Sequence, residues 1–150
     1  MSLYNIEDLL SKDIYDLNCI DTSNIVDMCS LFYIIDIKQP CTLDISEWDV
    51  SKVKDMKYMF YDCTIFNQPI GKWNVSNVED MNSMFAGCEN FNKDINGWNV
   101  SNVEDMNSMF DSCKNFNQPL NDWNVSNVED MYYMFNGCTS LKNKPSWYRY

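Results

Sequence analysis

The feature that most constrains this chain is a phrase that returns every twenty-five residues. "WNVSNVEDMNSMF" occupies residues 73–85 and again residues 98–110, and residues 123–135 read "WNVSNVEDMYYMF". A more divergent copy begins at Trp48. A unit this short cannot bury its own apolar side, so the copies are expected to stack, each contacting only its neighbours.

The repeat also predicts the domain boundaries. A degenerate unit, 21–47, carries "SNIVDMCSLF" and precedes four full units, 48–72, 73–97, 98–122 and 123–147. These units are expected to form one domain, 21–147. Residues 1–20 place apolar side chains at roughly helical spacing and are expected to form an N-terminal helical cap. The aromatic end "PSWYRY" is expected to close the last unit, with residues 148–150 as a short tail.

Within a unit, the apolar spacing indicates a short helix followed by an extended segment. Ser76 with Glu79 matches a capping box at the start of that helix, and the alternation around 98–100 indicates a short extended or parallel β segment. The predicted fold is therefore an α/β repeat solenoid of about five units. The positions that would form one face of the helix, and hence the core, are Val78, Met81, Met84, Phe85 and Cys88 with their equivalents.

The repeated letters resemble the BspA-like leucine-rich-repeat family, with its mycoplasma lipoprotein-type (DUF285-like) 25-residue repeat. The shared pattern, roughly W-[DN]-x-S-x-V-x-x-M-x-x-M-F-x-x-C-x-x-F-N-x-x-[IL]-x-x-W, is matched over residues 48–141 and weakly from residue 21. The resemblance implies a right-handed, leucine-rich-repeat-like stack and a role in binding proteins. Bacterial relatives are mostly surface proteins. The first residues do not match a signal peptide, so we expect an intracellular, cytoplasmic form from a viral or low-GC genome, and a surface or secreted form only if the chain is a fragment lacking its signal.

Composition narrows the classes of function. The formal net charge is −11, from 22 acidic and 11 basic residues, and there is no histidine. This balance disfavours direct binding to nucleic acid or to an anionic membrane and favours a protein partner, basic if charge guides the encounter. With no histidine and no glycine-rich phosphate loop, we expect no catalytic site, no cofactor and no metal. The seven cysteines, mostly one per unit, are expected to be reduced. Residues that recur at the same position of successive units form a column, and the cysteine column is expected to be buried.

The candidate partner-binding residues lie in two sets of positions. The acidic columns contribute Glu79, Asp80, Glu104, Asp105, Glu129 and Asp130. The positions that vary between units, such as 57–58, 61–62 and 132–133, contribute Tyr58, Tyr132 and Tyr133.

These positions support a protein-binding module as the predicted function. An acidic inhibitor or nucleic-acid mimic that occupies a basic site on a host factor is the alternative. A solvated face produced by duplication would explain the same acidic columns without any partner. Oligomeric state and partner identity stay open.

Overall fold

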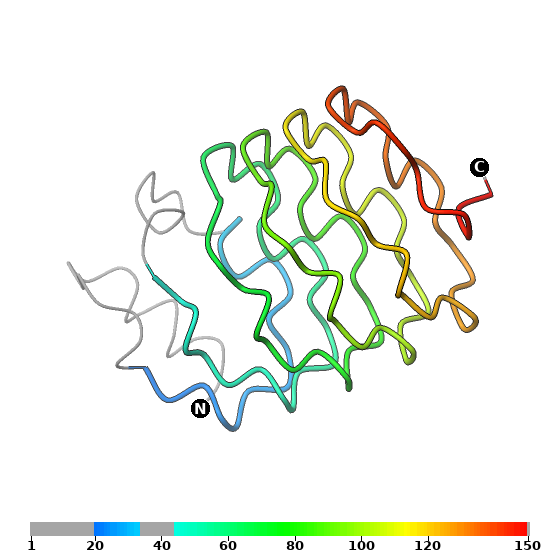
Figure 1. The fold of residues 1–150 in the computed structure, drawn as a ribbon. Helices are drawn as coiled ribbons and strands as arrows, with labels where there is room; N and C mark the ends of the chain where they lie inside the picture. Colours follow the sequence, from blue (N-terminus) through cyan, green and yellow to red (C-terminus); the bar gives the residue numbers. More distant parts are fainter. Residues whose placement is uncertain (1–19, 34–43, 150) are drawn as a thin grey trace.

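The computed structural model describes residues 20–33 and 44–149. Over these residues the chain winds into a stack of coils, with the first and last described coils at opposite ends (Figure 1). Four isolated parallel bridges join one aspartate of each coil to the next: Asp27, Asp55, Asp80, Asp105 and Asp130. The expected N-terminal helical cap lies outside the described residues apart from Ile20, which is buried.

The predicted α/β repeat solenoid of leucine-rich-repeat type is wrong. The described residues contain no helix, and their only β pairing is the set of isolated bridges. Where a helix was expected, the chain makes a run of tight turns, in which Met84 N–H donates to the Met81 carbonyl at 3.2 Å and Cys88 N–H to the Phe85 carbonyl at 2.8 Å. Nothing in the described part of the chain forms a helix of the length and apolar character that a bilayer crossing requires.

Left-handed residues are the physical reason why the helix does not form. Ser83 has φ 52° and Gly87 has φ 78°, values that a right-handed helix cannot contain. Between these two kinks, alternate N–H groups leave their own coil: Ser83 donates to Asn107 O at 2.8 Å and Phe85 to Met109 O at 3.0 Å. Turns of three and four residues return side chains to one side, and this spacing imitates a helical face.

The expected helix start and β segment are also corrected. Ser76 N–H donates to Oδ1 of Asn74 at 3.2 Å, and Glu79 N–H donates to the Lys54 carbonyl at 2.8 Å in the previous coil. Neither residue caps a helix. The bridges fall on the aspartate column, whereas residues 98–100, the expected extended segment, make none.

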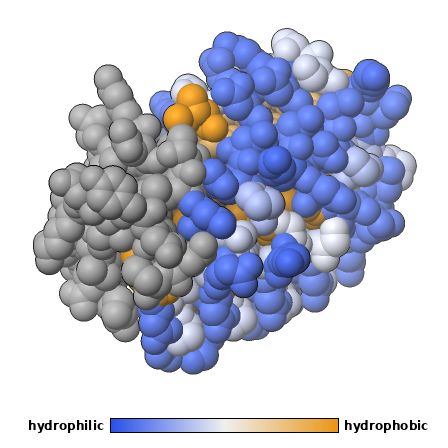
Figure 2. Space-filling view, turned by 60° about the vertical axis from the view of Figure 1, so that its left-hand side comes forward, coloured by the Kyte–Doolittle hydropathy of each residue, from blue (hydrophilic) through white to orange (hydrophobic). Residues whose placement is uncertain are grey.

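The prediction of the core columns is confirmed. Met81, Phe85 and Cys88 are each 0% exposed. One phenylalanine ring of each described coil stacks on that of the next, with centroids 5.1–5.7 Å apart between Phe32, Phe60, Phe85, Phe110 and Phe135. The described residues on the face drawn in Figure 2 are mostly hydrophilic at the surface, with hydrophobic residues showing in a few places between them.

Polar groups of the core side chains are satisfied by the preceding coil. The indole N–H of Trp98 donates to the Ile70 carbonyl at 3.2 Å, and the thiol of Cys113 donates to the Phe85 carbonyl at 3.0 Å. The five described cysteines, Cys29, Cys63, Cys88, Cys113 and Cys138, carry thiols and form no disulfide.

The aromatic end closes part of the last coil, as expected. Trp147 stacks on Trp123 at 6.3 Å, and its indole N–H donates to the Leu120 carbonyl at 2.8 Å. Tyr148 meets the ring of Phe135 edge-on at 5.1 Å. Trp147 thereby takes the place that a further coil's tryptophan would have.

Candidate functional site

The aspartate column makes the turns at one edge of the stack. Oδ1 of Asp80 accepts the N–H of Asn82 at 2.8 Å, and Oδ1 of Asp105 accepts the N–H of Asn107 at 2.7 Å. Asp130 repeats the contact with its own coil. These are Asx turns, which fold the backbone through a side-chain carboxylate. The three carboxylates are half-buried and already accept hydrogen bonds, so their first role is structural and they are less available to a partner than exposed carboxylates would be.

The glutamate column beside it is an exposed ridge. Glu79, Glu104 and Glu129 are all exposed, and the N–H of each later glutamate donates to the carbonyl of the preceding one at 2.8 Å. Lys54 Nζ lies 2.6 Å from Glu79 Oε1, with both side chains more than half exposed. Because solvent and salt screen an exposed pair of this kind, it contributes little to stability. The structure thus brings the six acidic candidates to one edge, which we call the acidic ridge.

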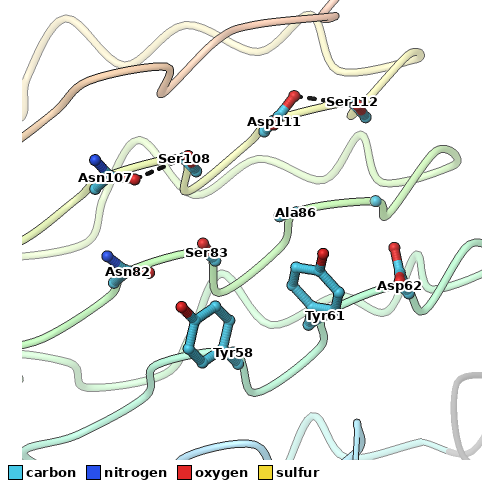
Figure 3. A pocket seen from close by; sticks show the side chains of 11 residues that line it. Tyr58, Tyr61, Asp62, Asn82, Ser83, Ala86, Asn107, Ser108, Asp111 and Ser112 are labelled. Carbon is cyan, nitrogen blue, oxygen red and sulfur yellow. Dashed lines mark hydrogen bonds between the residues drawn. The ribbon is translucent and has the colours of Figure 1, made fainter.

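A hollow of about 370 Å³ adjoins the acidic ridge and crosses three successive coils (Figure 3). We call it the trough. The side-chain amide of Asn82 lines it and donates to a carboxylate oxygen of Asp105 at 3.2 Å, which joins the trough to the ridge. The lining residues are Tyr58, Tyr61, Asp62, Asn82, Ser83, Ala86, Gly87, Asn107, Ser108, Asp111 and Ser112.

The hollow exists because the middle coil carries small side chains where its neighbour carries large ones. Ser83 and Ala86 are buried in the floor, while Tyr58 and Tyr61 stand on the adjacent coil (Figure 3). At Gly87, where φ is +78°, a Cβ would collide with the Asp62 carboxylate and lie 3.0 Å from its Cα. Because glycine has no Cβ, the Asp62 side chain can lie against the backbone at this position.

The trough has a negative electrostatic character. Its lining contains Asp62 and Asp111 but no lysine or arginine. The charge of Asp62, then burial and the neighbouring Tyr33 and Asp111, raise the pKa of Tyr61. Carboxylates, hydroxyls and carboxamides around tyrosine rings suit a ligand that offers N–H donors or positive charge and some apolar surface.

The three tyrosines predicted to contact a partner do not lie together. Tyr58 lines the trough and is half-buried. Tyr132 and Tyr133, which are 54% and 65% exposed, instead line a second hollow of about 430 Å³ on the last coil, with Asn136, Lys144 and Tyr148. We call it the terminal hollow.

Sequence reasoning did not name Tyr61, Asp62 or Asp111 among the binding candidates, although the trough includes them. The sequence feature that could have indicated them is variation between units, because the residue at these positions changes from unit to unit while the residues of the core columns do not. Only the coil geometry places them beside Tyr58 and Asn82.

One group of potential metal ligands occurs among the described residues. Ligand atoms of Asp27, Cys29 and Asp55 lie within 4.8 Å of one another. Burial is the largest cause that raises the pKa of Cys29, and the two neighbouring carboxylates raise it further, so the thiol is neutral at pH 7. Burial also raises the pKa of Asp55. Two carboxylates and one thiol supply three ligands, which is fewer than the closed set of four that a structural zinc site has.

Comparison with known proteins identifies one family. The family model described as "Mycoplasma protein of unknown function, DUF285" matches residues 36–148. No curated protein and no solved structure matches the chain.

Proposed function

Because the chain belongs to the DUF285 family of Mycoplasma proteins of unknown function, its role has to be inferred from its surface, and we propose that it is a protein-binding module. Its partner would present a basic or N–H-rich surface to the trough and the acidic ridge. The observation that carries this proposal is that sequence variation and position in the structure agree. The variable positions of three successive coils line one hollow, the trough, while the held positions form the core.

The chemistry of the trough supports a macromolecular partner. Tyrosines flanked by polar residues are typical anchors of protein interfaces. The trough is shallow and polar, and it continues into the exposed glutamates of the acidic ridge. An extended surface of this kind offers more contact to a protein than to a small molecule, which prefers a deep apolar pocket.

Negative charge on the trough and the ridge would guide the encounter. Long-range attraction speeds association with a basic partner and weakens as salt screens it. Tyr58 and Tyr61 would then supply the desolvated contact, and Asp62 and Asp111 would accept hydrogen bonds from the partner. No step of this proposal needs a catalytic group or a cofactor.

The test is photocrosslinking of the full chain in cells. A benzophenone amino acid in place of Tyr61 should capture a partner. The same group in place of Lys72, an exposed residue outside the trough, is the matched control and should not. Equal crosslinking from both positions, or none from Tyr61, contradicts the proposal.

Once a partner is captured, its affinity should be measured against ionic strength for wild type and for Glu104→Lys/Glu129→Lys. Restricting the reversal to the glutamates leaves the Asx turns of Asp105 and Asp130 intact. We expect affinity to fall with salt in the wild type and the slope to diminish in the variant. If the affinity of neither protein changes with salt, the acidic ridge is a solvated face that does not contribute to binding. If DNA or RNA displaces the captured protein, the alternative function, an acidic occupant of a nucleic-acid-binding site, is supported instead.

A further inference from the structure

The last coil presents a row of backbone donors with no acceptor. The N–H groups of Met131, Tyr133, Phe135 and Gly137 donate to no described residue. Their spacing is every second residue, as on the open edge of a β-sheet. The carbonyl of Glu129, just before them, is likewise without a backbone donor among the described residues. We call residues 129–137 the terminal edge.

Interior coils show what such an edge binds. The equivalent N–H groups of Met106, Ser108, Phe110 and Ser112 all donate to the next coil, at 2.7–3.0 Å. The partners are the carbonyls of every second residue: Asp130, Tyr132, Met134 and Asn136. The terminal edge repeats this arrangement with its acceptors missing, and an unpaired N–H gains from any acceptor that excludes water.

Apolar columns also reach the surface at this end. Val125, Val128, Cys138 and Leu141 are only partly buried, whereas their counterparts Val100, Val103, Cys113 and Phe116 are 0–1% exposed. Trp147 and Tyr148 cover the tryptophan and phenylalanine columns, and the N–H groups of Met131, Tyr133, Phe135 and Gly137 donate to neither of them. The end of the stack is thus closed over its aromatic part and open along 129–137.

A second copy of this chain does not fit the terminal edge. Two such edges face to face would set donors against donors. Among the described residues, the first coil offers no open apolar core column, because Met28 and Leu31 are both 0% exposed. The occupant has to bring its own row of carbonyls.

The edge is kinked, and this limits the occupant further. Tyr133 has φ 55° and Gly137 has φ 71°. In the interior, left-handed residues stand in register from coil to coil, as Ser83 with Ser108 and Gly87 with Ser112. A straight strand would diverge from the edge after about two hydrogen bonds. A segment that follows it needs left-handed turns at two positions four residues apart, which glycine, asparagine, aspartate or serine provides most readily.

We propose that the terminal edge binds an extended segment of another protein, running parallel to residues 131–137 and accepting its hydrogen bonds through alternate carbonyls. This is strand addition to an open edge. The segment carries small polar residues at its two kinks and apolar side chains over the exposed columns. The terminal hollow lies beside the edge, where Tyr132, Tyr133 and Tyr148 form an aromatic wall and Lys144 Nζ sits 4.8 Å from the Tyr148 ring. An aromatic or acidic side chain of the segment would enter it.

This site is separate from the trough, although its first two residues, Glu129 and Asp130, also belong to the acidic ridge. Residues 124–150 hold three basic and two acidic residues, Lys142, Lys144 and Arg149 against Glu129 and Asp130, although the whole chain is strongly acidic. This end of the stack therefore has more basic than acidic side chains and does not repel an acidic or neutral segment.

The test follows backbone hydrogen exchange in the isotope-labelled full chain by NMR. The probe is a synthetic peptide with the sequence of residues 98–122, which contains both kinks and the alternate carbonyls. At saturation, exchange of the Tyr133, Phe135 and Gly137 amides should slow at least about tenfold. The Met106, Ser108 and Phe110 amides, already bonded in the stack, should not change. Tyr133→Gly, which keeps the left-handed backbone and removes the ring, should weaken peptide binding while the same amides remain protected.

The all-D peptide of the same sequence is the matched control, because it has the same composition and charge but cannot follow the edge in register. Equal binding of the two peptides, or no saturable binding of the L peptide, overturns the proposal. So does slowing of the same amides with protein concentration alone, which would make the edge a contact between copies of this chain.

Discussion

At the scale of single residues, each core side chain repeats one contact in every coil. Phe110 stacks between Phe85 at 5.6 Å and Phe135 at 5.7 Å and is 0% exposed. Truncating it removes ring contacts in both directions along the stack, and neighbouring rings held in their own coils cannot collapse into the space.

Phe110→Ala should therefore lower the free energy of unfolding by about 3–5 kcal/mol. Urea denaturation of the purified protein measures this loss. Tyr132→Ala, at a residue 54% exposed on the last coil, is the control and should lose much less. A loss below about 1 kcal/mol for Phe110→Ala would show that the column is not core.

The cysteine column predicts a pH dependence. Burial is the largest cause that raises the pKa of Cys138, from its ordinary 9.0 to about 12, and burial likewise raises the pKa of Cys113. Folding favours the neutral thiol, so this contribution to stability is complete below pH 9.0 and is lost as pH rises towards about 12. The free energy of unfolding should fall over that interval, and less in Cys138→Ala than in wild type.

Thiol reactivity gives a direct check on the same residue. A thiol with a pKa of about 12 carries very little thiolate at about pH 8, so iodoacetamide should alkylate Cys138 at least about 100-fold more slowly in the native protein than in urea. Mass spectrometry of the alkylated peptides measures the two rates. All seven cysteines should react in the denatured, non-reduced protein, and a bridge between Cys88 and Cys113 would refute the reduced column.

At the scale of the coil, the left-handed residues decide the local structure. Gly87 has φ +78° and is crowded by Asp62, whereas a Cβ added at Gly97 would meet nothing within 4 Å. Gly87→Ala should cost about 1–3 kcal/mol through strain and collision, and Gly97→Ala should be neutral within about 0.5 kcal/mol. Thermal unfolding of the two variants compares them, and equal effects would argue against the kinked coil.

The Asx turn separates the structural role of an acidic residue from its charge. Asp105→Asn keeps an oxygen that can accept the Asn107 N–H, so stability should change by less than about 0.5 kcal/mol. Asp105→Ala removes that acceptor and should cost about 1 kcal/mol. Denaturant unfolding distinguishes the pair. Similar losses in both variants would mean that the charge, and not the turn, is what the fold needs.

At the scale of the whole molecule, the stack is held by bonds between coils and not by helices. The far-ultraviolet circular dichroism spectrum of the full chain should therefore lack the double minimum of an α-helix over the part that the structure describes. Any helical signal has to come from residues outside 20–33 and 44–149. A spectrum dominated by helix would contradict the coil architecture.

The sequence by itself determined the period and the buried columns. When apolar residues recur at fixed positions every 25 residues, the units can bury them by stacking, so that each apolar residue packs on its equivalent in the next unit. Met81, Phe85 and Cys88 could be assigned to the core for that reason. The acidic columns could be placed on one edge by the same argument, since copies of one position stack.

Only the tertiary structure decided the backbone path and the composition of the candidate site. Turns and helices share a spacing of three and four residues, so the pattern around Val78 and Met84 could not distinguish them. The choice depends on where alternate N–H groups find acceptors, and the acceptor of Ser83 lies in another coil, at Asn107. The trough and the terminal edge follow from that path, because both are defined by which coil lies beside which, a relation that no single unit of the sequence contains.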